Sequence, residues 1–256
     1  MKDWNPDKYL LFENERTQPA IDLVEKISLS NPKKIIDIGC GPGNSTRILA
    51  NKWPNCNVVG LDSSKSMIEK AKSDYPNQTW IHERAENIAD DKEYSLVFSN
   101  ASLQWMDNPE ILIPKLWNAV EDNGAFAAQI PNFENMPVNF AINDALKKEK
   151  WNNRIKSNIW NKQHEINYYY EILNKYAGEI TLWETHYYHI MESMKGIIDF
   201  VRSTALRPYL EQLVTEDEKR ELENEILDEC KKRYNEQSNN KVLFPFQRMF
   251  IIAYKK

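Results

Sequence analysis

Three glycines separated by single residues follow a short apolar run in the first fifth of the chain. The run covers residues 34–36, and the segment after it reads Asp37-Ile-Gly-Cys-Gly-Pro-Gly43. Glycine has no Cβ, so Gly39, Gly41 and Gly43 can adopt dihedrals that other residues avoid and let a ligand lie against the main chain. We therefore predict a strand-to-helix turn that binds a ligand through its backbone.

The spacing of this segment restricts the chemistry of the ligand. A dinucleotide fingerprint needs a glycine three residues after the second one, and Asn44 stands there. A P-loop needs Lys followed by Ser or Thr, which the segment lacks. A second apolar run, 57–61, ends at Asp62, 19 residues beyond Gly43, where a carboxylate can accept both hydroxyls of a ribose. An adenosine without phosphates fits this pattern best.

Alternating strand and helix patterns position these residues. The rhythm runs from about residue 33 to 131 and predicts βαβ units with a parallel sheet. The predicted helices cover 45–53, 64–73 and 110–120, and the main strands cover 34–36, 57–61, 94–99, 125–130, 179–189 and 250–254. The expected fold class is α/β: a Rossmann-like, mostly parallel sheet of seven strands with helices on both faces and a helical cap.

The cap is expected to come from two insertions, 133–166 and 192–240, in a single domain that spans 1–256. Within the second insertion, Thr215 and Glu218 have the spacing of a capping box and predict the start of a long charged helix.

An N-terminal segment, 1–30, carries aromatic residues that either fold over the cofactor as a lid or pack as a surface helix. The aromatic residues concerned are Trp4, Tyr9 and Phe12. In the lid interpretation Arg16 and Gln18 face the pocket.

Composition excludes several classes of function. The formal net charge is −5, so a basic surface for nucleic acid is not expected. No stretch approaches the roughly 18 apolar residues of a bilayer-spanning helix, and the first residues lack a signal peptide's apolar core. We therefore expect a cytoplasmic protein without a membrane or nucleic-acid partner.

The three cysteines include no C-x-x-C pair and the four histidines show no ligand spacing, so no disulfide framework and no metal site are expected. Cys40 is expected to fill the turn without a catalytic role.

The glycine-rich loop and the acid after the second strand resemble those of class I methyltransferases, which use S-adenosyl-L-methionine (SAM). Strings outside this core are similar to the bacterial trans-aconitate 2-methyltransferase family. They are Asp3-Trp4-Asn5-Pro6 with Tyr9, Cys40-Gly41-Pro42-Gly43-Asn44-Ser45-Thr46, Asn100-Ala101-Ser102-Leu103-Gln104-Trp105, Tyr187-Tyr188-His189 and Leu206-Arg207-Pro208.

The resemblance implies methyl transfer from SAM to one carboxylate of a small polycarboxylic acid, giving a monomethyl ester and S-adenosylhomocysteine. A carboxylate is already ionised near neutral pH, so its oxygen needs no general base. The cofactor-binding residues implied by the resemblance are Asp37, Gly39, Gly41, Asp62, Ala85 and Asn100.

A tri-anionic substrate requires local cations, and guanidinium groups grip carboxylates with two hydrogen bonds. The resemblance implies catalytic positions at Trp105, Arg207, Tyr188 and His189. The implied substrate-binding residues are Arg16, Gln18, Trp105, Tyr187, Tyr188, His189 and Arg207.

Two alternatives stay open at this point. Gln18 also resembles carboxyl methyltransferases that act on longer monoacids, such as fatty or isoprenoid acids. A SAM-binding sensor without turnover is the second alternative, because the proposed chemistry demands no diagnostic base. A monomer or weak homo-oligomer with a small-molecule substrate is expected in either case.

Overall fold

A computed structural model describes residues 13–89, 91–156 and 164–256 of the chain. The chain divides into two compact units. Among the described residues, the sheet unit comprises 13–89, 91–131, His164–Glu184 and Arg248–Lys256, and the helical unit comprises 132–156 and Thr185–Gln247. The N-terminal aromatic residues of the expected lid, Trp4, Tyr9 and Phe12, lie outside the described residues.

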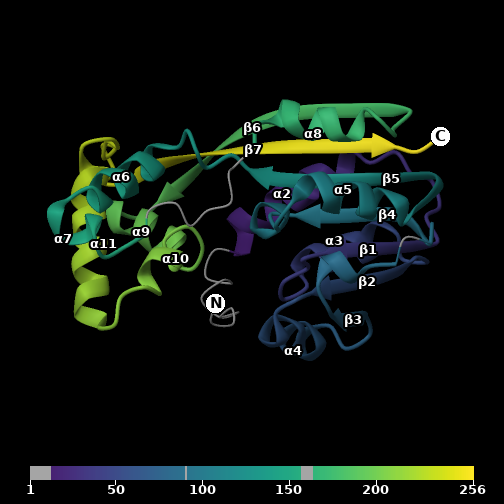
Figure 1. Cartoon of the computed structure of the whole chain (residues 1–256), viewed down its shortest axis with the longest axis horizontal. Helices are drawn as coiled ribbons and strands as arrows, with labels where there is room; N and C mark the ends of the chain where they lie inside the picture. The colour runs from purple at the N-terminus through teal and green to yellow at the C-terminus, as the bar shows by residue number, and fades with distance from the viewer. Residues whose placement is uncertain (1–12, 90, 157–163) are drawn as a thin grey trace. The chain divides into compact units, whose positions relative to one another are not determined.

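A seven-stranded sheet organises the fold, with the strand order β3-β2-β1-β4-β5-β7-β6 (Figure 1). Strands β1 to β5 pair in parallel, and β7 runs antiparallel to β5. The strands are β1 (Lys34–Ile38), β2 (Asn57–Asp62), β3 (Thr79–His82), β4 (Tyr94–Asn100), β5 (Val120–Pro131), β6 (Glu179–Met191) and β7 (Val242–Tyr254). The predicted α/β class with a mostly parallel seven-stranded sheet is confirmed.

Helices connect the parallel strands, as the alternating pattern predicts. The helices of the sheet unit are α2 (Glu13–Lys26), α3 (Asn44–Lys52), α4 (Lys65–Asp74), α5 (Pro109–Asn118) and α8 (Ile166–Leu173). Two 3₁₀ turns, Ala85–Asn87 and Leu103–Trp105, follow β3 and β4. The helix expected over 110–120 ends at Asn118, because β5 begins at Val120.

The register divides the sheet's side chains between two faces. Asp37 aligns with Phe98, and Asn100 aligns with Gln129, so these residues share one face. Helix α3 covers this face, since its Ser45 hydroxyl reaches the Asp37 carboxylate. The other face forms a hydrophobic core with α5 and α8, which contribute residues such as Leu112, Leu116, Tyr169 and Leu173.

Strand β7 is much longer than the expected 250–254. The prediction missed its first half, because that half alternates between buried and exposed residues instead of being uniformly apolar. Val242, Phe244 and Phe246 are buried, while Leu243, between the first two, is exposed. This period of two is typical of a strand with one buried face.

The helical unit packs α11 (Glu216–Lys231) against α6 (Pro137–Leu146) and α9 (Met194–Arg202). Its remaining helices are the short α7 (Glu149–Asn152) and α10 (Arg207–Leu210). The predicted capping box is confirmed: Thr215 Oγ1 accepts from the Glu218 backbone N–H at 3.2 Å, and the Glu218 carboxylate accepts from the Thr215 N–H at 3.3 Å. This pairing satisfies two backbone donors at the start of α11.

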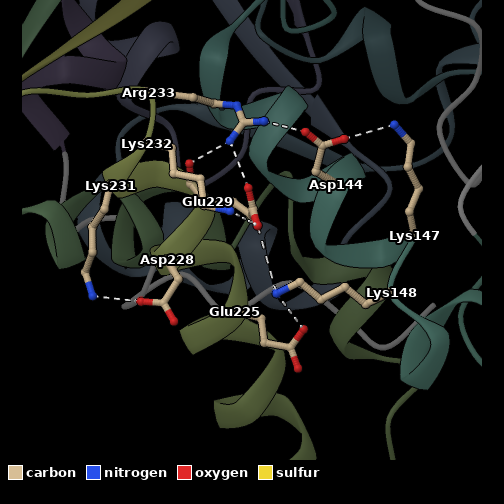
Figure 2. A network of polar contacts seen from close by, with 9 residues as sticks. All are labelled: Asp144, Lys147, Lys148, Glu225, Asp228, Glu229, Lys231, Lys232 and Arg233. Carbon is tan, nitrogen blue, oxygen red and sulfur yellow. Dashed lines mark hydrogen bonds and ion pairs between the residues drawn. The ribbon is translucent and has the colours of Figure 1, made fainter.

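Ion pairs connect the two longest helices of the helical unit (Figure 2). Arg233 contacts both Asp144 of α6 and Glu229 of α11, and Lys148 lies 3.2 Å from Glu225. A hydrogen bond from Lys147 lowers the pKa of Asp144, and one from Lys232 lowers the pKa of Glu229. The Glu229 side chain is buried, whereas those of Asp144 and Lys148 are partly exposed, so the pairs differ in how strongly water screens them.

Candidate active site

The glycine-rich loop leaves β1 and is tied to the end of β2. The N–H groups of Gly39 and Cys40 donate to the Leu61 carbonyl at 2.7 and 3.0 Å, and the Gly41 N–H donates to Asp62 Oδ2 at 2.9 Å. Gly39, Gly41 and Gly43 have φ angles of 69°, 54° and 99°. All three glycines therefore have the left-handed backbone that other residues avoid.

The three glycines are required for different reasons. A Cβ at Gly39 would lie 2.3 Å from the Cβ of Ser102, and one at Gly43 would lie 2.6 Å from the Trp80 ring. A Cβ at Gly41 would meet no atom of the described residues within 4 Å. Gly39 and Gly43 therefore permit close packing of the protein on itself, whereas Gly41 presents bare backbone to open space.

Asp62 ends β2 beside this open backbone. Its Oδ2 accepts from the Gly41 N–H, and its Oδ1 accepts from the Ser64 N–H at 2.7 Å. The two backbone donors fix the plane of the carboxylate. The half-buried carboxylate is thus oriented before any ligand arrives.

Asp37 lies beneath the loop and connects β1 to the first turn of α3. Its Oδ2 accepts from the hydroxyls of Ser45 and Thr46 at 2.6 and 2.7 Å, while its buried Oδ1 has no partner among the described residues. Burial raises the pKa of Asp37 to about 6, and the nearby Asp62 charge adds to the rise, against the two hydroxyls that lower it. Through its two hydrogen bonds the Asp37 carboxyl group holds the start of α3 against β1, and so supports the loop between them.

The turn after β4 closes onto the same loop through hydroxyl groups. Ser102 Oγ donates to the Ile38 carbonyl at 2.8 Å, and Ser99 Oγ lies 2.7 Å from Ser102 Oγ. Ala101 has a φ of 52°, a backbone conformation that costs an L-residue roughly 1–2 kcal/mol. The buried Oδ1 of Asn100 has no partner among the described residues and is left for a donor on a ligand.

Sequence reasoning missed the structural role of Ser99 and Ser102. Both hydroxyls are buried and contact the residue that precedes the first glycine. Their spacing, Ser-x-x-Ser at a strand end, was a usable signal, because such hydroxyls commonly satisfy backbone carbonyls at turns.

The 3₁₀ turn after β3 carries Ala85, one of the expected cofactor-binding residues. Ala85 begins this turn and is only 4% exposed. Glu83 Oε1 accepts from the Arg84 N–H at 2.8 Å and from Asn87 at 2.9 Å, so this acid stabilises the turn itself. The side chain of Arg84 is exposed and pairs with Glu86.

Three of the expected substrate residues belong to the sheet unit. Trp105 is half-buried at the end of its 3₁₀ turn, and Arg16 is buried on α2, with 7% of its surface exposed. Gln18 is exposed and donates to Asp22 Oδ1 at 2.7 Å, one turn further along α2. Arg16 and Gln18 therefore differ in environment, although both lie on α2.

The remaining expected substrate residues belong to the helical unit. Arg207 Nε donates to Glu211 at 2.9 Å. Tyr187 and His189 share one face of β6, and His189 packs among Phe200, Phe244 and Phe246. Tyr188, on the opposite face, is 62% exposed. The structure therefore does not bring Tyr188 together with its two neighbours, and the substrate roles of all four residues stay predictions.

Cys40 is buried in the glycine-rich turn. Cys40 packs against Ile68, Ala71 and Trp80, and burial raises the pKa of its thiol well above the usual range, so a thiolate is disfavoured there. Across 13–89, 91–156 and 164–256 there is no group of three or more His, Cys, Asp or Glu residues able to hold a metal ion. No helix within these ranges combines the length and apolarity that crossing a bilayer requires.

The arrangement fits an adenosine-bearing cofactor. Asp62 provides fixed acceptors for a ribose, Gly41 leaves its backbone uncovered, and Asn100 offers a buried acceptor at the neighbouring strand end. All three lie at the carboxyl ends of parallel strands, where ligands bind in open α/β sheets.

Comparisons with known proteins define the class. Residues 35–124 match a family model described as a methyltransferase domain. Among solved structures, the YcgJ protein from Bacillus subtilis superposes with a TM-score of 0.62 at 12% identity, covering 93% of this chain and 99% of that one. A putative methyltransferase from Bacillus halodurans gives a TM-score of 0.60 at 13% identity, covering 93% and 99%. The chain thus has a methyltransferase domain in a fold shared with these proteins.

Curated relatives narrow the class to a family. Trans-aconitate 2-methyltransferase from Escherichia coli O157:H7 (strain EC4115 / EHEC) is 35% identical over 253 residues, which cover 99% of this chain and 98% of the relative. The protein of the same name from Shigella dysenteriae serotype 1 (strain Sd197) is also 35% identical over the same shares. This chain belongs to the trans-aconitate 2-methyltransferase family.

Proposed function

We propose that this protein transfers the methyl group of S-adenosyl-L-methionine to one carboxylate of trans-aconitate. The observation that carries the proposal is the bare backbone of Gly41 beside the fixed Asp62 carboxylate, in a chain that aligns with trans-aconitate 2-methyltransferases over 98% of their length. When bound, SAM supplies a methyl group on a positively charged sulfur, which is activated for transfer without help from a metal.

The residues of the sheet unit hold the cofactor. Asp62 accepts the ribose hydroxyls, and the Gly41 backbone lies against the nucleoside because no Cβ intervenes. Ala85 lines the adenine side, and Asn100 accepts a hydrogen bond from the amino-acid end of the cofactor. Asp37 and Gly39 act indirectly, since they hold the loop on β1 and on the turn after β4.

The reaction needs alignment more than acid–base chemistry. A carboxylate oxygen forms a bond to the methyl carbon as the carbon–sulfur bond breaks, and the bonding electron pair stays on sulfur, so no proton is transferred. The substrate carboxylate is ionised near neutral pH, which makes a general base unnecessary. We infer that the half-buried Trp105 ring, which follows β4, excludes water from the reacting atoms.

The test is an ester-forming assay with a panel of acids. Purified protein is incubated with SAM and with trans-aconitate, cis-aconitate, citrate, isocitrate or a fatty acid, and monomethyl esters are identified by mass spectrometry. Selective esterification of trans-aconitate is the expected result. Esterification of the fatty acid alone would replace the polycarboxylate with a monoacid, and SAM binding without any ester would favour a sensor.

Two glycine variants test the cofactor site directly. Gly41→Ala should weaken SAM binding at least about 10-fold in calorimetry, since the added methyl group fills the space that the nucleoside needs. The variant should lose only about 1–2 kcal/mol of stability, because alanine there must adopt a left-handed backbone. Gly178→Ala is the matched control, because its Cβ would meet the flexible Lys256 side chain. Equal SAM affinity in both variants would contradict the placement of the cofactor.

Cytoplasmic location and a monomeric or weakly associated state stay predictions. The domain boundaries of the expected cap also stay a prediction, although most of 133–166 and 192–240 falls in the helical unit.

A further inference from the structure

A buried arginine occupies the same edge of the sheet as the cofactor residues. Arg248 of β7 is only 2% exposed and aligns with Pro131, the last residue of β5. Because β7 runs antiparallel to β5, this residue in the middle of β7 lies at the carboxyl edge of the parallel strands. Asp62 and Asn100 end their own strands at that edge.

The register also places Arg248 on the same face as the other polar residues of the site. Asn100 aligns with Gln129, and Gln129 aligns with Phe250, two residues from Arg248. Residues two apart on a strand share a face, so Arg248, Gln129 and Asn100 project from one side of the sheet. Asp37 projects from the same side, through its alignment with Phe98.

Gln129 orients the guanidinium and adds a second donor. Arg248 Nη1 donates to Gln129 Oε1 at 3.3 Å, which requires the amide oxygen of Gln129 to face the arginine. The Nε2 atom of Gln129 is buried and has no hydrogen-bond partner among the described residues. A buried N–H donor of this kind is costly unless an acceptor reaches it. One carboxylate could accept from Arg248 and from Gln129 together.

The charges along this edge are separated. Asp62 lies on β2, and Arg248 lies four strands away in the order β2-β1-β4-β5-β7. With about 4.8 Å between neighbouring strands, the two ends of this row are roughly 19 Å apart. An acid suits ribose hydroxyls at one end, whereas a guanidinium suits a carboxylate at the other.

We propose that Arg248, oriented by Gln129, binds a non-reacting carboxylate of the substrate and thereby selects tricarboxylates over acids with fewer carboxylates. This inference rests on the proposed function. A strong guanidinium contact to the reacting carboxylate would stabilise a charge that disappears in the ester, and would raise the barrier. Contact with a non-reacting carboxylate keeps its strength in the transition state, so it improves binding without slowing transfer.

Arg248 was not among the residues selected from the sequence. It lies in Phe246-Gln247-Arg248-Met249-Phe250, where a charged residue interrupts an apolar run. Charged residues are almost never fully buried without a specific partner, and that interruption was the available signal.

The test compares steady-state kinetics of Arg248→Met and Arg248→Lys with those of the wild type. The substrates are trans-aconitate and two unsaturated dicarboxylates, each lacking a different carboxylate of trans-aconitate. Arg248→Met should raise KM for trans-aconitate about 10- to 100-fold with kcat changed less than about threefold, since charge-assisted hydrogen bonds have this strength. It should leave KM unchanged for the dicarboxylate that lacks the recognised group. Arg248→Lys should recover part of the selectivity, because it keeps the charge but loses the paired geometry.

Three results would overturn the inference. If Arg248→Met kept the wild-type selectivity for trans-aconitate over both dicarboxylates, Arg248 would bind no substrate carboxylate. A weakened SAM affinity with intact selectivity would assign the arginine to the cofactor instead. If Arg248→Met does not fold, Arg248→Lys with wild-type KM values for all three acids would contradict the proposal.

The control is Arg220→Met, which removes an exposed arginine that pairs with Asp217 on α11, and it should leave all constants unchanged. Failure of the wild type to esterify any polycarboxylate would refute the proposed function and is seen before any variant is compared.

Discussion

The pKa of Asp37 predicts how the stability of this protein depends on pH. The carboxyl group is buried and its pKa is raised from 3.8 to about 6 in the folded protein. Between these two values the native state therefore binds more protons at this site than the unfolded state. Stability contributed by this group accordingly falls as the pH rises from about 4 to about 6.

The size of the effect follows from the shift. A change of about two pKa units corresponds to about 3 kcal/mol between the fully protonated and fully ionised limits. Part of the titration occurs below the range where stability is easily measured. Integration of the two titration curves leaves a loss of about 1.4 kcal/mol between about pH 5 and pH 7.5.

Asp37→Asn isolates this contribution. The amide oxygen can still accept from Ser45 and Thr46, but the side chain no longer ionises. We compare the free energies of unfolding of variant and wild type, measured by urea titrations followed by circular dichroism. The variant should become more stable relative to the wild type as the pH rises. We expect the difference between variant and wild type to grow by about 1.4 kcal/mol between about pH 5 and pH 7.5. Any constant cost of burying the new amide cancels in this change with pH.

The reasoning has a control and a clear refutation. Asp228 is exposed, and its hydrogen bond to Lys231 lowers its pKa, so Asp228→Asn should give a difference that does not change over this pH range. A flat difference for Asp37→Asn would show that the Asp37 carboxyl titrates normally. A difference that shrinks as the pH rises would show that its ionised form is favoured in the folded protein.

Two further predictions concern local backbone structure, and both are checked by thermal and urea unfolding. Ala101 has a left-handed backbone, so Ala101→Gly should leave the stability equal to or slightly above that of the wild type. Ala101→Val should cost about 2 kcal/mol or more, because β-branched residues resist this conformation. A loss of stability with glycine would show that the backbone at Ala101 is not strained. Thr215→Ala removes the acceptor for the Glu218 N–H at the start of α11 and should cost about 1 kcal/mol, while Thr215→Ser should cost much less; equal losses for the two substitutions would exclude the cap as the cause.

The sequence by itself determined the local features that depend on short-range stereochemistry. The glycine spacing predicted a strand-to-helix turn with dihedrals that other residues avoid, and the capping box predicted the start of α11. The alternation of strand and helix patterns predicted the parallel sheet. The turn and the cap follow from residues within one or two turns of the chain, and the sheet follows from the order of successive elements, so the sequence is sufficient to identify them. The match of several separate strings also identified the family that the relatives then showed.

The tertiary structure decided what strand pairing brings together. The need for glycine at Gly39 depends on Ser102, which is 63 residues away in the chain and touches it only because β1 pairs with β4. The length of β7 and the position of Arg248 at the carboxyl edge follow from the antiparallel register with β5. Register fixes which distant side chains share a face, and no local pattern within one segment contains that information.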